Sequence, residues 1–238
     1  MGRFCGFWPN IFKFFTIAVI IMRKSKQILI LGTSTDIGKT FLTCELIAKS
    51  KKQNEKLKVV KPLISGFNRD DENCDTVKII KHLGINLDEK NIEAVSPFRL
   101  KDPLSPLTAA KNEGKEISYN EVLNFCREQI TESRSGNFDL IIESAGGLMT
   151  PICIGKTFLD LAQDLGIEIY LVGACFLGGI SATLSAYENL TNRQCKNITI
   201  LISDHLEYDR AHLKISDFLS EIKNFADCDV FLVENFIK

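Results

Sequence analysis

Residues 29–49 read LILGTSTDIGKTFLTCELIAK, and in them a Gly-Lys-Thr tripeptide stands between two different hydrophobic patterns. The apolar run in residues 26–32 fits a buried strand. From Lys39 to Lys52 apolar residues recur at helical spacing, and the stretch ends in lysines, which a helix C-terminus prefers. A strand that turns through glycine into a helix is the setting of a phosphate-binding loop, because backbone N–H groups and the positive helix end attract phosphate. The stretch therefore predicts a nucleotide site.

The spacing of this loop departs from the usual phosphate-binding signature, in which four residues separate the two glycines. Here five residues separate Gly32 from Gly38, and Thr33 stands where the first glycine is expected. If the loop binds a nucleotide, Lys39 reaches the terminal phosphates and Thr40 is a ligand of Mg²⁺. The alternative is a turn rich in glycine and threonine in which Gly-Lys-Thr occurs by chance.

The rest of the chain alternates between strand and helix patterns. Apolar runs typical of buried strands lie in residues 56–62, 138–143, 167–175, 196–204 and 228–235. Helix patterns lie in residues 74–84, 118–133, 156–165, 179–191 and 207–225, with a short helix at the end of the proline-punctuated loop 96–114. Ser118 is expected to cap its helix, with Glu121 completing a capping box. The alternation predicts one α/β domain over residues 22–238, a P-loop NTPase-like and mostly parallel sheet with helices on both faces.

Charge and cysteine content indicate which partners and which cellular compartment the chain suits. The formal net charge is −1, from 29 basic and 30 acidic residues spread along the chain, so we expect no nucleic acid as the main partner. The eight cysteines form no Cys-x-x-Cys pair, and they fit reduced thiols of a cytoplasmic protein.

The first 21 residues are apolar and aromatic, and three interpretations compete. A membrane span is interrupted by Pro9, Asn10 and Lys13, and a signal peptide would need a small-residue cleavage site that the following residues do not offer. In the third interpretation Met22 is the start, and residues 1–21 are a dispensable extension. We favour the third, and we expect no membrane partner.

Polar residues follow the predicted strands, at the edge where parallel sheets bind ligands. Glu143 ends one strand and could hold Mg²⁺, or it could be a solvated edge glutamate. Lys61 ends another strand and could stabilise a transferring phosphate, or it could be a surface lysine. Asp75 could be a metal ligand or simply a helix N-cap. The Asn-Lys-x-Asp tetrapeptide by which GTPases read guanine is absent from the chain.

Taken together, GTSTDIGKT (32–40), KPLISG (61–66), NCDT (73–76) and ESAGGLMTPI (143–152) resemble dethiobiotin synthetases, over residues 22–204. The loop usually reads G-T-x-T-x-x-G-K-T in that family, which accounts for its spacing here. The resemblance implies a cytoplasmic homodimer of biotin biosynthesis that converts 7,8-diaminononanoate, CO₂ and ATP with Mg²⁺ to dethiobiotin. It also implies a carbamate and then a carbamic–phosphoric anhydride as intermediates.

The resemblance also assigns residues. It implies that Lys39 and Lys61 are catalytic and that the metal ligands are Thr40, Asp75 and Glu143. It implies nucleotide contacts from Asp36, Ile37, Gly38, Lys39, Thr40, Phe41, Asp75, Glu143, Ser144, Ala145, Gly146, Ser203 and Asp204. It implies substrate contacts from Thr35, Ser65, Gly147, Thr150, Gly179, Ile180 and Ser181, where the helix that begins at Gly179 reaches the neighbouring subunit's site.

The sequence departs from the family pattern at three places. Ser144 replaces a glycine, which a negative φ would allow. Ser203 replaces the asparagine that reads adenine, and the usual C-terminal base loop and last helix are missing. We therefore expect a relaxed preference for the base. Alternatives are an amidating synthetase of the cobyrinate type and a nucleotide switch without enzymatic activity. Partition ATPases carry an extra lysine early in the loop, and here none precedes Lys39 within it.

Overall fold

The computed structural model describes residues 24–204 and 214–238. The interpretation of residues 1–21, and the part of the expected helix that covers residues 207–213, lie outside this part of the chain.

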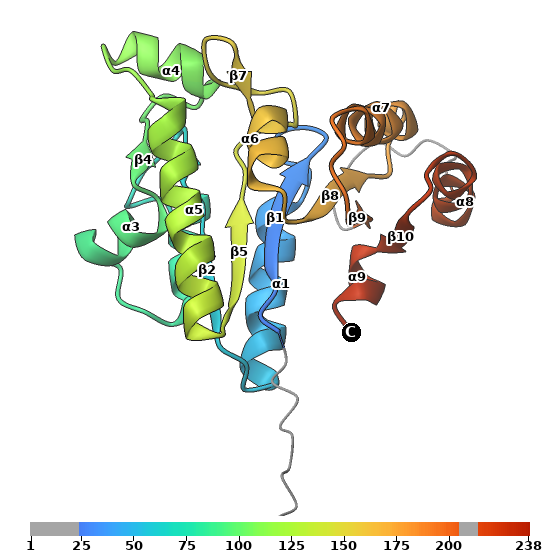
Figure 1. Ribbon diagram of the computed structural model, residues 1–238, viewed down its shortest axis with the longest axis horizontal. Coiled ribbons are helices and arrows are strands. Elements are labelled where there is room, and N and C mark those ends of the chain that lie inside the picture. Colours follow the sequence, from blue (N-terminus) through green and yellow to red (C-terminus); the bar gives the residue numbers. More distant parts are fainter. Residues whose placement is uncertain (1–23, 205–213) are drawn as a thin grey trace, which may run out of the picture.

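A six-stranded sheet forms the centre of the molecule (Figure 1). Its order is β10-β9-β8-β1-β5-β2, and all five pairings are parallel. The strands are β1 (Gln27–Gly32), β2 (Leu57–Val60), β5 (Asp139–Glu143), β8 (Glu168–Ala174), β9 (Ile198–Ser203) and β10 (Asp229–Leu232).

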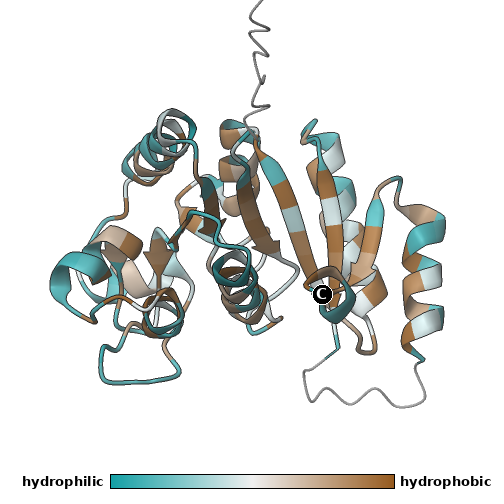
Figure 2. Cartoon of the chain, turned by 90° about the horizontal axis from the view of Figure 1, so that it is seen from below, coloured by the Kyte–Doolittle hydropathy of each residue, from teal (hydrophilic) through white to brown (hydrophobic). Residues whose placement is uncertain are grey.

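Helices cover both faces of this sheet and divide the core into two main clusters. Alternate residues of β1 show the division: Leu29 and Leu31 belong to one cluster, and Ile28 and Ile30 to the other. The first cluster includes buried residues of α4 (Pro106–Asn112), α5 (Tyr119–Gly136), α6 (Phe158–Leu165), α7 (Gly179–Asn192) and α8 (Ile215–Phe225). The second includes those of α1 (Lys39–Lys52), α2 (Asp75–Leu83), α3 (Glu89–Val95) and α9 (Val233–Phe236). Figure 2 shows the apolar strands between helices whose outer surfaces are more hydrophilic. The predicted fold is confirmed.

Several local predictions are also confirmed. Gly84 ends α2 in the left-handed region at φ 71°. Ser118 is the N-cap of α5, and its side chain accepts a hydrogen bond from the Glu121 backbone N–H, which is the N-cap half of the predicted capping box. The helix after Ser118 is longer than predicted, because it continues to Gly136.

Other boundaries were wrong, and some elements were missed. The helix predicted over residues 156–165 begins at Phe158, because Thr157 and Asp160 form a capping box there. In the described part of the helix predicted over residues 207–225, Lys214 is an extended N-cap and α8 begins at Ile215. The strand expected over residues 228–235 ends at Leu232, where α9 begins. The missed elements are α3, α9, the parallel pair β3 (Leu63–Ile64) and β4 (Phe98–Arg99), and the antiparallel pair β6 (Pro151–Cys153) and β7 (Lys156–Thr157).

Within residues 24–204 and 214–238, none of the helices has the length and apolar character that crossing a membrane requires.

Candidate active site

The loop between β1 and α1 wraps tightly around the start of the helix. Gly38 is the N-cap of α1 at φ 98°, a conformation that favours glycine, and Asp36 has φ 51°, which aspartate tolerates better than most residues. A Cβ atom on Gly32 would lie 2.9 Å from both Ile37 Cγ2 and Lys39 Nζ. Gly32 is therefore required by close packing, although it lies one position before the usual first glycine.

Hydrogen bonds with β8 and with the segment that follows β5 hold the base of the loop. The Thr33 N–H donates to the Val172 carbonyl at 2.9 Å, and the Leu148 N–H donates to the Gly32 carbonyl at 2.8 Å. Inside the loop, Lys39 is buried and its Nζ donates to the Ser34 carbonyl at 2.9 Å. Burial, followed by the charge of Lys61, lowers the pKa of Lys39 to about 8. A bound anion would supply the negative charge that this ammonium group lacks.

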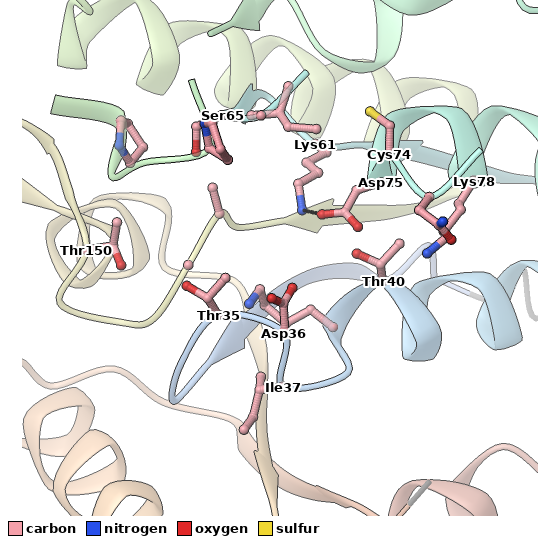
Figure 3. Close-up of a pocket in the computed structure, with 18 of the residues that line it drawn as sticks. Thr35, Asp36, Ile37, Thr40, Lys61, Ser65, Cys74, Asp75, Lys78 and Thr150 are labelled. Atoms are coloured by element: carbon pink, nitrogen blue, oxygen red, sulfur yellow. Dashed lines mark hydrogen bonds and ion pairs between the residues drawn. The ribbon is translucent and has the colours of Figure 1, made fainter. Parts of the chain in front are cut away.

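Lys61 lies at the end of β2 and contacts two carboxylates, of which Figure 3 shows Asp75. Its Nζ donates to Asp75 Oδ2 at 2.6 Å and to Glu143 Oε1 at 2.7 Å. Lys61 is 2% exposed and Glu143 is 0% exposed. Burial alone would lower the pKa of Lys61, but the charges of Glu143 and Asp75 outweigh burial and raise this pKa above its ordinary value.

Two threonines of α1 complete the hydrogen bonding of Glu143. Thr40 Oγ1 donates to Glu143 Oε1 at 2.6 Å, and Thr43 Oγ1 donates to Glu143 Oε2 at 2.5 Å. The parallel register pairs Ile30 with Glu143, so Glu143 lies beside the carboxyl end of β1, where the phosphate loop begins. For Asp75, burial would raise the pKa, but the charge and hydrogen bond of Lys61, together with the Thr40 hydroxyl and the charge of Lys39, outweigh burial and lower this pKa below its ordinary value.

These contacts exclude three simpler interpretations. Glu143 is not a solvated edge residue, and Lys61 is not a surface lysine, because both are buried. Asp75 is not the N-cap of α2, since Cys74 holds that position and Asp75 is the first helical residue. The Asp75 carboxylate accepts a hydrogen bond from Lys61 instead.

The same residues provide oxygen donors of the type that Mg²⁺ prefers. In the described ranges no group of three or more His, Cys, Asp or Glu side chains could form a metal site without help. Magnesium in nucleotide sites is commonly held by one or two carboxylates, with phosphate and water supplying the remaining ligands. This chain offers two such carboxylates, Asp75 and Glu143, and the hydroxyl of Thr40 beside them. The two carboxylates already attract one positive charge, the ammonium group of Lys61, which shows that they suit a cation.

A pocket of about 650 Å³ opens above this cluster. Most of the sequence-predicted site residues line it: Thr35, Asp36, Ile37, Gly38, Lys39, Thr40, Phe41, Lys61, Ser65, Asp75, Ala145, Gly146 and Thr150. Glu143 lies behind them and is hydrogen-bonded to Lys61 and Thr40. The structure thus brings residues from four separate segments into one cavity.

Other predicted residues lie outside this pocket. Ser144 is buried. A serine can replace the family's glycine here only if its φ is negative, and Ser144 is not among the described residues with a positive φ. Gly147 lines an adjacent hollow of about 500 Å³ together with residues of α7. Gly179, Ile180 and Ser181 form the first turn of α7, and neither hollow includes them. Ser203 is 1% exposed, and neither it nor Asp204 lines the 650 Å³ pocket.

Sequence reasoning missed part of the pocket wall. Lys78 lies three residues after Asp75 on α2, and this helical spacing was the signal that could have identified it. The remaining missed residues are Ile64, Gly66, Asp71, Asn73, Cys74 and the segment 103–106. Segment 103–106 approaches through long-range packing, because Gly66 lies directly against Pro103, and no local pattern reveals that contact.

Comparison with known proteins identifies a family model and two curated relatives that match most of the chain. A family model described as an AAA domain matches residues 26–234. The chain is 34% identical over 174 residues to the ATP-dependent dethiobiotin synthetase BioD of Phenylobacterium zucineum, which covers 72% of this chain and 73% of that protein. It is 33% identical over 186 residues to the protein of the same name from Caulobacter vibrioides, covering 76% of this chain and 81% of that protein.

The similarity to solved structures is limited to the fold, because the sequence identities are low. The MinC:MinD cell division protein complex of Aquifex aeolicus matches with a TM-score of 0.52 and 16% identity, over 87% of this chain and 79% of that chain. The signal recognition particle receptor FtsY from Elizabethkingia anophelis in complex with GDP matches with a TM-score of 0.51 and 13% identity, over 91% of this chain and 59% of that chain.

Proposed function

Because the chain belongs to the dethiobiotin synthetase family, we propose that it is an ATP-dependent dethiobiotin synthetase that acts in biotin biosynthesis. The observation that carries this proposal is the buried Lys61, held between Asp75 and Glu143 at the floor of the phosphate-loop pocket. A nucleotide switch has no need of a second buried lysine beside its phosphate loop, whereas a phosphoryl-transfer enzyme needs positive charge where negative charge develops.

The proposed reaction has three steps. One amine of 7,8-diaminononanoate adds to CO₂ and loses a proton, which gives a carbamate. A carbamate oxygen then attacks the γ-phosphorus of ATP, ADP leaves, and a carbamic–phosphoric anhydride forms. The second amine attacks the carbonyl carbon of the anhydride, and the departure of phosphate closes the ring of dethiobiotin.

The residues of this chain divide these tasks. The backbone of residues 36–41 and Lys39 bind the phosphates, and Lys61 stabilises the negative charge of the carbamate. Thr40, Asp75 and Glu143 would hold Mg²⁺, which when bound would offset the charge of the phosphate oxygens. Ser65 and Thr150 line the other end of the pocket from Thr40, where they can position the diamine (Figure 3). Phosphoryl transfer depends mainly on such positioning and charge neutralisation.

The test is ADP release by the purified full-length protein. We expect release only when ATP, Mg²⁺, 7,8-diaminononanoate and bicarbonate are all present, with one dethiobiotin formed per ADP. Omission of the diamine or the bicarbonate is the internal control. Nucleotide binding without turnover, or hydrolysis that ignores the diamine, would favour the nucleotide switch and contradict the proposal.

We further propose that a second subunit completes the substrate site. The first turn of α7 follows Gly178. The Gly179 N–H donates to the Phe176 carbonyl, and the next two N–H groups, those of Ile180 and Ser181, have no acceptor within the helix and suit a carboxylate such as that of the diamino acid. Leu177 beside it is 81% exposed, and Met149 on the adjacent hollow is 56% exposed. Exposed apolar side chains of this kind are suited to burial between two subunits.

Leu177→Asp is therefore expected to weaken the dimer and to lower specific activity, while ATP still binds because the phosphate pocket lies within one chain. Light scattering and activity should be measured on the same dilution series. Ile85→Asp is the matched control, since Ile85 is also exposed but follows α2. A fully active monomer at assay concentration would refute a shared site.

A further inference from the structure

Among the residues that the structure describes, three lysines line the 650 Å³ pocket, and two of them already have partners. Lys61 is held by two carboxylates, and Lys39 donates to the Ser34 carbonyl. The third, Lys78, is half-buried. In the described part of the chain no carboxylate lies within ion-pair distance of its ammonium group.

The position of Lys78 indicates what it can bind. Asp75 and Lys78 are three residues apart on α2, so they share one face of the helix. Figure 3 shows Lys78 at the end of the pocket where Asp75 and Thr40 lie, whereas Ser65 and Thr150 lie toward the other end. The lysine therefore lies among the residues proposed to hold the phosphates and the metal, and away from those proposed for the diamine.

We propose that Lys78 is an ATP-binding residue whose ammonium group donates to a phosphate oxygen of the nucleotide. This inference rests on the proposed function. A triphosphate carries more negative charge than a single divalent ion neutralises, so it can accept further cationic donors. Because Lys61 is occupied by Glu143 and Asp75, a separate lysine on the α2 side supplies the cation that Lys61 does not.

The simpler interpretation is that the Lys78 stem only covers apolar surface and leaves its charge in water. Lys81, one turn further along α2, illustrates that behaviour. Its side chain is 49% exposed, it pairs with Glu72 at 2.7 Å, and it does not line the pocket. Lys81 is therefore a matched control, since it has the same residue type on the same helix without the pocket.

The experiment compares Lys78→Met with Lys81→Met in the full chain. Methionine keeps the packing of the stem and removes the charge. The dissociation constants of ATP and ADP with Mg²⁺ are measured by titration calorimetry, and KM is measured for ATP and for 7,8-diaminononanoate. Loss of one charge-assisted hydrogen bond predicts an increase of about tenfold or more in the dissociation constant of ATP for Lys78→Met. We expect the KM for ATP to rise by a similar factor and the KM for the diamine to stay near the wild-type value.

Lys81→Met should bind ATP as the wild type does, and Lys78→Arg should recover most of the affinity. Unchanged ATP affinity in a folded Lys78→Met protein overturns the proposal, and so does a rise confined to the KM of the diamine. If Lys78→Met melts well below the wild type, the same titrations on Lys78→Gln decide. The titrations measure ATP binding directly, so they test the role of Lys78 even if the protein makes no dethiobiotin. A failure to make dethiobiotin would contradict the proposed function and not the role of Lys78.

Discussion

Replacing Lys61 with alanine is expected to lower kcat by about two to three orders of magnitude, the usual cost of removing a charge-stabilising group from such a site. The affinity for ATP with Mg²⁺ should not fall below that of the wild type, because the ammonium group of Lys61 contacts Asp75 and Glu143 rather than the phosphate loop. Nucleotide titration and steady-state kinetics on the same preparation separate the two effects.

The same substitution is expected to destabilise the folded protein in the absence of metal. Glu143 is 0% exposed, and without Lys61 its charge remains buried beside Asp75 with no cation between the two carboxylates. Removing one partner of a buried ion pair typically costs about 3–5 kcal/mol of unfolding free energy. Since Mg²⁺ with ATP would place a cation in the same position, thermal melts should recover when both are added.

Lys58→Ala is the control for both measurements. Lys58 lies in β2, the strand that leads to Lys61, but its pair with Glu132 is exposed, and an exposed pair contributes about 1 kcal/mol or less. A Lys61→Ala enzyme with near-normal turnover would contradict the catalytic assignment. If that variant does not fold, Lys61→Met, which retains most of the packing, provides the comparison.

The central fold could be predicted because its signals are local. Each residue of β1 is buried, and alternate residues enter opposite clusters, so the strand reads as a continuous apolar run. The phosphate loop depends on a few consecutive residues, and Gly38 follows directly from the positive φ that its position in the loop requires. By contrast, β3 and β4 are two residues long, and no periodicity can be recognised over that length.

The site was predicted as a set of residues but not as a set of contacts. Lys61 and Glu143 both end parallel strands, and this places them at one edge of the sheet. Lys61 contacts both Glu143 and Asp75 only because of where α2 lies, and α2 is positioned by long-range packing against α1. An aspartate near a helix start has the same local sequence whether it caps the helix or pairs with a lysine. The sequence therefore could not choose between the two roles of Asp75.

Replacing Lys39 with alanine is expected to act on binding as well as on turnover, unlike the replacement of Lys61. The ammonium group of Lys39 is buried in the loop, where it has one carbonyl partner and no counter-charge within hydrogen-bonding distance among the described residues. Burial and the nearby charge of Lys61 lower the pKa of Lys39 to about 8, so the charged form lacks stabilisation until an anion binds. A phosphate at this position gains a desolvated, charge-assisted hydrogen bond that water cannot replace.

We therefore expect Lys39→Ala to raise the dissociation constant of ATP by about one to two orders of magnitude. Turnover at saturating ATP should also fall, by about two to three orders, because the charge that develops on the transferred phosphate loses its nearest loop cation. Lys52→Ala, at the exposed end of the same helix, is the control and should match the wild type in both measurements. If Lys39→Ala binds ATP as tightly as the wild type, the loop does not hold the terminal phosphates through this lysine. The Gly-Lys-Thr at residues 38–40 would then be a turn that resembles a nucleotide site without acting as one.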